Sequence, residues 1–381
     1  MRHHSSILIL LALAATARAA EPPPLLTKIP APAMPADAAN PVAADVNADG
    51  RDDLLVPAAQ RLHVLLSRGD GTFAPWAASP VALPMKVNET LAADFNADGH
   101  IDLAFAHHDS YDVAILLGDG RGNFSAPPGS PFNAKPAART PHTHGLAAAD
   151  FNRDAKLDLV VANNADNDIS LLLGDGRGAF AVAERSPFPC GQGPYPIATA
   201  DFDADGNADV IVPDAAPGAN TVTVLLGAGD DATLRPAPWS PIKIPGGAFF
   251  AAAGDINGDA KPDAVITHTE GDDRATILIN NGAGRLAPAP TSPLTIGHNA
   301  WCVAIEDMNR DGRADLTFAA DTAVRVFLGD GAGNFTPAAG SPFATPKGAW
   351  RLRVADFNAD GKRDVGARCV DAKELVIMMG R

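Results

Sequence analysis

The chain has 381 residues, 46% of them hydrophobic, and a formal net charge of −15 at pH 7. This acidic balance argues against nucleic acid as a partner, because binding to phosphates depends on Lys and Arg. The hydrophobic share argues against intrinsic disorder. The length exceeds that of one ordinary core, which suggests two or three domains unless a repeat explains it.

Residues 1–19 have the features of a secretory signal peptide. Arg2 begins a short basic region, residues 7–15 are apolar, and Ala17-Arg18-Ala19 places small residues before a cleavage point. The apolar stretch is too short to span a bilayer, and we expect no membrane span elsewhere in the chain. We therefore expect an exported protein, periplasmic or secreted, whose mature part is residues 20–381.

An acidic nine-residue loop occurs seven times along the chain, first as DVNADGRDD from Asp45. The other six copies begin at Asp94, Asp150, Asp201, Asp255, Asp307 and Asp356. A regular period of this size indicates a repeat architecture. Because the copies run almost from end to end, we expect residues 20–381 to form one repeat domain.

Each repeat is predicted to contain four short strands. In the third repeat, small residues at 145–150 precede the acidic loop, apolar runs follow at 158–163 and 169–174, and a glycine-rich turn leads to a last run ending near Ser186. Short strands separated by turn residues predict an antiparallel meander. Radial repetition of such sheets predicts a propeller. The predicted fold class is therefore all-β, a seven-bladed β-propeller of four-stranded antiparallel blades.

The last repeat lacks its fourth strand, because only DVGARCV and ELVIMMGR follow its acidic loop. Residues 23–32 precede the first repeat and can supply that strand. We therefore expect the N-terminal strand to close the ring, which would also cover an otherwise unpaired edge.

The acidic loops have the composition of calcium sites. Oxygen-bearing side chains stand at loop positions 1, 3, 5 and 9, and Ca²⁺ takes about six to eight oxygen ligands from such loops. Mg²⁺ fits less well because it retains water and requires a strict octahedron. We expect up to seven Ca²⁺ ions, one per blade. The predicted ligands are Asp45, Asn47, Asp49, Asp53, Asp94, Asn96, Asp98, Asp102, Asp150, Asn152, Asp154, Asp158, Asp201, Asp203, Asp205, Asp209, Asp255, Asn257, Asp259, Asp263, Asp307, Asn309, Asp311, Asp315, Asp356, Asn358, Asp360 and Asp364.

Position 6 of the loop is glycine in five copies, and glycine adopts a positive φ without strain. The other two copies have Ala155 and Ala260 there. If these alanines keep a positive φ, the strain costs about 1 kcal/mol each. We therefore expect the loops that begin at Asp150 and Asp255 to hold their ions less tightly.

The loop pattern D-x-D/N-x-D-G/A-x-x-D resembles that of FG-GAP/VCBS-type repeats. Such repeats are found in integrin α-chain propellers, in a seven-bladed fungal lectin and in many exported bacterial proteins. The resemblance covers nearly the whole mature chain, and the pattern is intact in every copy, whereas only some integrin blades carry it. It implies a calcium-stabilised extracytoplasmic propeller commonly used for binding, without identifying a ligand.

A second register places aromatic or imidazole rings six residues before the first aspartate of repeats three to seven. These residues are His144, Tyr195, Phe249, Trp301 and Trp350, while the first two repeats have Ala39 and Asn88. The rings could stack on sugars or grip an apolar group at the channel mouth, on the face away from the acidic loops. They could instead pack between neighbouring blades. Exposure of the rings distinguishes the two interpretations.

Three further features leave alternatives open. His142-Thr143-His144 has the spacing of a transition-metal pair, but the sequence indicates no third ligand, so two exposed loop histidines remain an alternative. Cys190, Cys302 and Cys369 can form one disulfide or none. Neither a G-x-S-x-G motif nor a Cys/His nucleophile pair with family context is present.

We therefore predict a monomeric, non-catalytic module that binds glycans or envelope or extracellular proteins. The alternative is a propeller enzyme of the polysaccharide lyase or dehydratase type.

Overall fold

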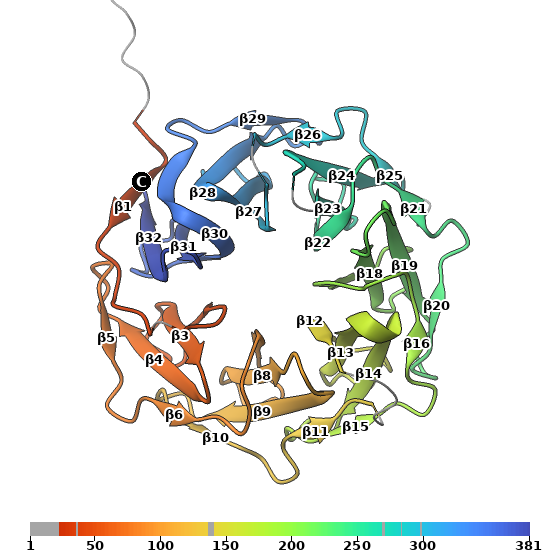
Figure 1. Ribbon diagram of the computed structural model, residues 1–381, viewed down its shortest axis with the longest axis horizontal. Coiled ribbons are helices and arrows are strands. Elements are labelled where there is room, and N and C mark those ends of the chain that lie inside the picture. The colour runs from red at the N-terminus through yellow and green to blue at the C-terminus, as the bar shows by residue number, and fades with distance from the viewer. Residues whose placement is uncertain (1–22, 36, 136–140, 269–270, 283, 298) are drawn as a thin grey trace, which may run out of the picture.

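The computed structural model describes residues 23–381 except 36, 136–140, 269–270, 283 and 298. The described chain is all-β apart from one short 3₁₀ helix, η1 (Asn164–Asp166). Antiparallel sheets stand radially around a central opening, so the molecule is a β-propeller (Figure 1). The predicted signal peptide, residues 1–19, lies outside the described residues. Among the residues described, no helix is long and apolar enough to cross a membrane.

The third repeat shows the structure of one sheet. Strands β12 (Thr143–Ala149), β13 (Asp158–Asn163), β14 (Asp168–Gly174) and β15 (Phe180–Val182) pair antiparallel in sequence order. A two-residue strand, β16 (Phe188–Pro189), also pairs with β14. The predicted four-strand meander is thus present, with an additional short strand at the outer side.

Four other sheets follow the same order. In the first two repeats the strands are β2 (Val42–Ala44), β3 (Asp53–Ala58), β4 (Arg61–Ser67), β5 (Phe73–Pro75), β6 (Val81–Ala82), β7 (Glu89–Ala93), β8 (Asp102–Ala106), β9 (Asp112–Gly118), β10 (Phe124–Ser125) and β11 (Phe132–Asn133). In repeats four and five they are β17 (Ala198–Ala200), β18 (Asp209–Asp214), β19 (Thr221–Gly227), β20 (Leu234–Pro236), β21 (Ile242–Lys243), β22 (Ala248–Gly254), β23 (Asp263–His268), β24 (Arg274–Asn280), β25 (Leu286–Pro288) and β26 (Leu294–Thr295).

The last two repeats share one seven-stranded sheet. Its strands are β27 (Cys302–Glu306), β28 (Asp315–Gly329), β29 (Phe335–Pro337), β30 (Phe343–Ala355), β31 (Asp364–Cys369), β32 (Glu374–Gly380) and β1 (Leu26–Ile29). The two repeats are joined because β28 pairs with β30. The N-terminal strand β1 pairs antiparallel with β32, with Leu26 opposite Gly380 and Ile29 opposite Ile377.

Small residues in the innermost strands allow neighbouring repeats to approach closely. The Thr199 hydroxyl donates to the carbonyl of Ala148 in the preceding repeat at 3.4 Å. Gly145 has a φ of 72°, and a Cβ there would lie 2.9 Å from Pro196 Cα. A larger residue at this position would therefore collide with the backbone of the next repeat.

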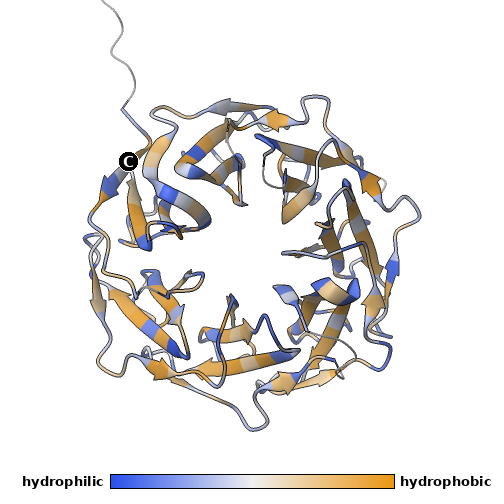
Figure 2. Ribbon diagram, in the orientation of Figure 1, coloured by the Kyte–Doolittle hydropathy of each residue, from blue (hydrophilic) through white to orange (hydrophobic). Residues whose placement is uncertain are grey.

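The hydrophobic core is divided among the interfaces between consecutive repeats. One cluster, for example, contains Val160 and Ile169 of the third repeat with Val210 and Leu225 of the fourth. Another joins Phe357 and Ile377 of the last repeat to Leu54 and Val56 of the first. Each sheet therefore contributes both of its faces to the core. Figure 2 shows the corresponding pattern, with hydrophobic residues along the strands and hydrophilic residues towards the loops.

Each of the first six repeats carries a serine before a cis-proline near its outer edge. The hydroxyl oxygen of Ser186, for example, accepts the amide hydrogen of Leu171 at 3.0 Å. The three cysteines all have free thiols, so the fold contains no disulfide among its described residues. Strand pairing and apolar packing therefore hold the sheets together.

We predict that deleting residues 20–32, which include β1, exposes the edge of β32. An unpaired strand edge is a template for pairing with another chain. The deleted protein should therefore associate or unfold, whereas the intact chain stays monomeric in light scattering. A deletion variant that remained monomeric, with an unchanged melting temperature, would show that β1 is a dispensable linker.

Candidate functional site

Each acidic loop connects the first and second strands of its repeat and is closed by its own carboxylates. In the second repeat, Asp94 accepts the amide of Asp98 on Oδ1 at 3.2 Å and that of Gly99 on Oδ2 at 2.8 Å. The equivalent pair of bonds occurs in all seven loops. These bonds hold the position 1 carboxylate against the loop backbone.

The loops contain two residues with positive φ rather than one. At position 6, Ala155 and Ala260 have φ of 61° and 63°, so the alanines keep the conformation that glycine has elsewhere. Position 4 also has a positive φ. It is Gly258 in the fifth loop and a non-glycine residue, such as Ala97 or Arg153, in the other six. The sequence pattern did not indicate this second position, because alanine and arginine do not mark it.

The position 9 aspartate is fully buried in every loop. Asp158 accepts the amide of Phe151 at 2.9 Å on one oxygen and that of Gly174, at the end of β14, at 2.8 Å on the other. All seven repeats contain this bridge. The residue therefore fastens the loop to the third strand, whether or not an ion is bound.

Burial raises the pKa of these aspartates. The pKa of Asp53 and of Asp209 is raised to about 7, and that of Asp102, Asp158 and Asp364 to about 6. Nearby loop carboxylates raise it further, while the two backbone amides act in the opposite direction. A dication bound in the loop would favour the ionised forms.

The donor set of the loops fits a hard cation, because every predicted ligand offers oxygen. In the fourth repeat, oxygens of Asp201, Asp203 and Asp209 lie within 4.8 Å of one another. In the other six loops, position 3 is asparagine, which offers an amide oxygen instead of a carboxylate. Bound calcium would neutralise the crowded carboxylates and order the loop around itself.

The five rings of the predicted rim lie in contact along the channel mouth. His144 stacks on Tyr195 with centroids 4.2 Å apart, and Tyr195 lies 4.6 Å from Phe249. Phe249 contacts Trp301 edge to face at 5.2 Å, and Trp301 stacks on Trp350 at 4.2 Å. The shared sequence register thus produces one continuous arc across repeats three to seven.

Four of these rings line one pocket of about 580 Å³. Its aromatic wall consists of Tyr195, Phe249, Trp301 and Trp350, and its polar groups include Asn299, Asp321, Lys347 and Asp371. Phe249 is buried, at 7% exposure, and the other three rings are partly buried. Packing and exposure therefore coexist, because each ring contacts its neighbour and still lines the pocket. We name this pocket the aromatic basin.

A buried ion pair lies beside the arc within the inner strands. Arg351 is 3% exposed, and its guanidinium lies 3.4 Å from Glu89 Oε2, which belongs to the second repeat. The same guanidinium donates to the carbonyl of Trp301 at 3.4 Å and lies 5.0 Å from the centre of the Phe250 ring. The sequence did not indicate this pair, because its members are 262 residues apart.

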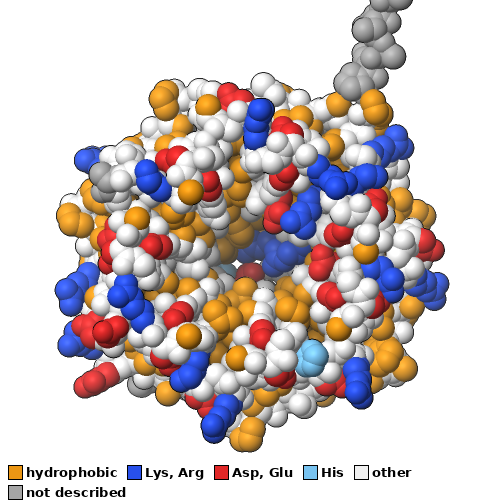
Figure 3. All heavy atoms as spheres, turned by 180° about the vertical axis from the view of Figure 1, so that it is seen from behind, with side chains coloured by type: hydrophobic (Ala, Val, Ile, Leu, Met, Phe, Trp, Pro, Cys, Tyr) orange, Lys and Arg blue, Asp and Glu red, His pale blue; other side chains and the backbone are white. Residues whose placement is uncertain are grey.

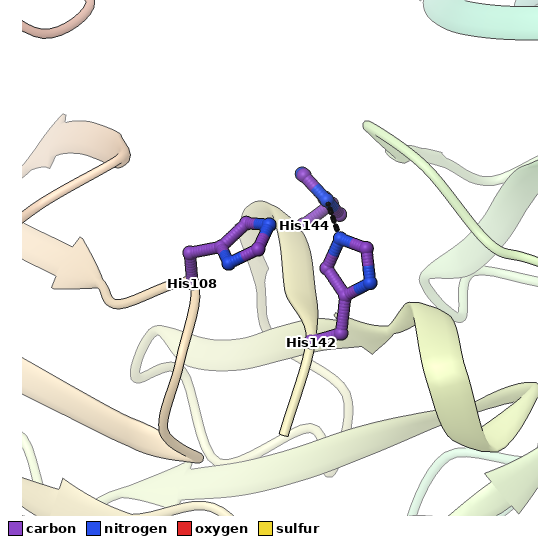
Figure 4. Close-up of side chains that lie close together, drawn as sticks. All are labelled: His108, His142 and His144. Atoms are coloured by element: carbon purple, nitrogen blue, oxygen red, sulfur yellow. Dashed lines mark hydrogen bonds between the residues drawn. The ribbon is translucent and has the colours of Figure 1, made fainter. Parts of the chain in front are cut away.

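Three histidines meet at one end of the arc (Figure 4). His142 and His144 come from the segment that enters β12, and His108 follows β8 of the preceding repeat. The Nε2 atoms of His142 and His144 are 2.6 Å apart, and ligand nitrogens of all three residues lie within 4.8 Å of one another. Burial, followed by the charge of neighbouring histidines, lowers the pKa of His144 to about 3. The third histidine escaped sequence analysis because it belongs to a different repeat.

The opposite side of the ring is seen in Figure 3. Lys and Arg side chains alternate with Asp and Glu around the central opening, and hydrophobic side chains are visible inside it. Charges of both signs are thus distributed around this face, without one large patch of a single sign.

The radial all-β sheets and the repeated acidic loop together define an acidic-loop β-propeller. A family model described as an FG-GAP-like repeat matches residues 45–105, 94–161, 150–212, 255–318 and 307–367. The chain belongs to this FG-GAP-like repeat family, as the loop pattern indicated. None of the curated protein sequences matches the chain significantly.

Several solved structures share the fold. A lectin from Agrocybe aegerita that recognises non-reducing terminal N-acetylglucosamine is 21% identical with a TM-score of 0.56, and the match covers 78% of each chain. BBS1N in complex with ARL6DN is 12% identical with a TM-score of 0.60, covering 94% of this chain and 98% of that one. A protein of unknown function from Desulfotomaculum acetoxidans is 10% identical with a TM-score of 0.58, covering 85% of this chain and 88% of that one. At these identities the likeness shows the fold alone.

We predict that Asp158→Ala destabilises the protein even when calcium is removed by chelator. The substitution leaves two buried amides unpaired, which costs about 1–3 kcal/mol each in free energy of unfolding. Asp154→Ala is the matched control, since this partly exposed loop carboxylate makes no bond to β14. In chelator the control should change stability by less than about 0.5 kcal/mol. Equal losses for both variants in chelator denaturation would contradict the bridging role.

Proposed function

We propose that the protein is an exported, monomeric, seven-bladed propeller that binds calcium in its acidic loops and glycans in the aromatic basin. Each acidic loop marks one blade, and the seven-stranded sheet counts as two blades joined through β28 and β30. The cluster between the last and first repeats and the pairing of β1 with β32 support a closed ring. The sequence features of residues 1–19 support export.

Calcium binding is supported by the composition of the loops and by their geometry. Seven loops carry crowded carboxylates, and the buried position 9 aspartates have raised pKa values that a bound cation would lower. The chain belongs to a family whose loops resemble those of calcium-binding propellers.

The observation that carries the glycan proposal is the composition of the aromatic basin. Sugars present apolar faces, which stack on rings, and hydroxyl groups, which require hydrogen-bonding partners at the edge. The basin combines a wall of rings with Asn299, Asp321 and Lys347 around it. Lys347 is exposed and pairs with Asp371 at 3.6 Å, so both groups can exchange this contact for one with a ligand.

The other proposed ligand class is an envelope or extracellular protein, and a binding screen against proteins tests it. An enzyme of the polysaccharide lyase or dehydratase type would require an acid and a base that titrate near the working pH. Around the basin, burial raises the pKa of Tyr195 and lowers that of His144 to about 3. Both shifts move these groups away from neutrality, which favours the non-catalytic alternative.

We predict that removing calcium lowers the melting temperature substantially. A ligand that binds only the folded state stabilises it by about 2.7 kcal/mol per site at 100 times its dissociation constant. Excess Mg²⁺ should not restore stability, and the loops at Asp150 and Asp255 should lose their ions first. Calorimetry in chelator, in Ca²⁺ and in Mg²⁺ measures the effect. An unchanged melt together with an absence of calcium in metal analysis would refute the assignment.

We predict that Trp350→Ala and Lys347→Ala abolish or strongly weaken glycan binding. Trp350 supplies a stacking surface, and the exposed Lys347 supplies a polar contact without supporting the core. Trp239→Ala is the matched control, because Trp239 packs against another interface cluster outside the basin. A glycan array identifies a ligand, and titration calorimetry with that ligand compares the variants.

Unfolding measurements separate loss of contact from loss of fold. Lys347→Ala should change the free energy of unfolding by less than about 0.5 kcal/mol, as surface substitutions usually do. Trp239→Ala should cost stability and leave binding intact. Retained glycan affinity in both Trp350→Ala and Lys347→Ala would remove the basin from the function.

A further inference from the structure

We propose that His108, His142 and His144 form a binding site for one transition-metal ion, with Zn²⁺ as the best-fitting candidate. Loops of two neighbouring repeats bring the three rings together, and Figure 4 shows them turned towards one another. Ligand nitrogens of the three rings lie within 4.8 Å of one another. This site is separate from the seven acidic loops and does not depend on the proposed glycan function.

The spacing of the nitrogens requires only a small adjustment to hold a metal. Two imidazole nitrogens bound to one tetrahedral Zn²⁺ at about 2.0–2.1 Å stand about 3.3 Å apart. The Nε2 atoms of His142 and His144 are 2.6 Å apart, which is a hydrogen-bonding distance. An ion bound by both nitrogens replaces that hydrogen bond and requires them to separate by about 0.7 Å, which small rotations of the two rings can supply. Both residues flank Thr143, which is 1% exposed, so the backbone between them is fixed.

The third ligand already has an orienting partner. His108 Nδ1 lies 2.6 Å from the carboxylate of Asp109, which leaves Nε2 for a metal. In metal sites, a histidine commonly donates its second N–H to a carboxylate, which fixes the tautomer and makes the ligand more basic. The ring centroids of His108 and His142 are 4.2 Å apart, so the oriented ring stands beside the pair rather than away from it.

The ligand type determines which ions the site selects. Imidazole suits Zn²⁺, Cu²⁺ and Ni²⁺, whereas carboxylate and amide oxygens suit Ca²⁺ and Mg²⁺. The chain therefore carries two kinds of site with opposite preferences. Three protein ligands leave a fourth tetrahedral position for water or another oxygen donor. His144 stacks on Tyr195 of the aromatic basin, so the proposed metal site lies at the end of the arc of rings.

The experiment uses the mature chain, residues 20–381, without an added histidine tag, in excess Ca²⁺ so that the acidic loops are saturated. Zn²⁺ is titrated by calorimetry, and Co²⁺ is added separately because its visible absorption reports coordination number. We expect one Zn²⁺ per chain and the intense absorption of four-coordinate Co²⁺. The absence of both, or binding only at the level of an unrelated propeller without the histidines, would overturn the proposal.

Variants identify the ligands. His108→Ala removes a partly exposed ring, with 41% of its side chain accessible, and should leave the fold intact while lowering Zn²⁺ affinity more than about 10-fold. His142→Ala and His144→Ala should lower Zn²⁺ affinity to a similar extent. His63→Ala on β4 is the matched control and should bind Zn²⁺ as the parent does. His3 and His4 lie in the predicted signal peptide, so the mature parent and its variants, residues 20–381, all lack them.

Asp109→Asn tests the orienting role separately. It should weaken Zn²⁺ binding by about 10-fold. This is the lower end of the range for residues that hydrogen-bond to a metal ligand, because 71% of the Asp109 side chain is accessible. Melting temperatures without Zn²⁺ should match the parent for His108→Ala and Asp109→Asn. Added Zn²⁺ should raise the parent and control values most, the Asp109→Asn value less and the His108→Ala value least. Equal Zn²⁺ affinity in the parent and in all three histidine variants would refute the site.

Discussion

The structure depends on a buried carboxylate that ties two segments of each repeat together. The position 9 aspartate accepts one amide from the start of its loop and one from the end of the third strand, as Asp158 does with Phe151 and Gly174. A fully buried, ionisable side chain is unfavourable without partners. Its two backbone bonds offset that cost in the folded chain, and a bound cation would offset it further. The acidic loop thus connects strands through its buried aspartate even without a bound metal ion.

The acidic loops keep one sequence pattern on one face of the ring. The loops of the opposite face and the entries to the inner strands can therefore differ in sequence from repeat to repeat. The arc of rings forms at these entries because the ring-bearing position of each repeat lies at the start of its innermost strand. The equivalent positions of neighbouring repeats therefore lie next to one another. The Arg351–Glu89 pair connects the seventh repeat to the second within this inner region. Removing either charge would leave the other buried and unpaired, so the pair constrains the geometry of the arc.

Much of this architecture was predictable from sequence, because the same pattern of strands and loops occurs seven times. The repeated pattern predicted the order of the strands and the small residues of the innermost strands. The missing fourth strand of the last repeat predicted that the N-terminal segment pairs with the last strand. The positive φ at Ala155 also followed, since glycine marks that position in other copies. The features that the sequence did not predict depend on contacts between repeats. They are the contact of His108 with His142, the ion pair of Arg351 with Glu89, and the exposure of each ring in the arc. Periodicity predicts which positions are equivalent, but not which non-equivalent side chains meet.

The arc of rings is incomplete, because Ala39 and Asn88 occupy its register in the first two repeats. A ring of seven similar repeats therefore presents the aromatic basin on one side of its axis instead of repeating it in every blade. If this basin is the glycan site, as proposed, one molecule would bind monovalently there and would not cross-link two ligands through it. Tight attachment to a surface of repeated sugars would require several copies held side by side, since avidity comes from simultaneous engagement of more than one site.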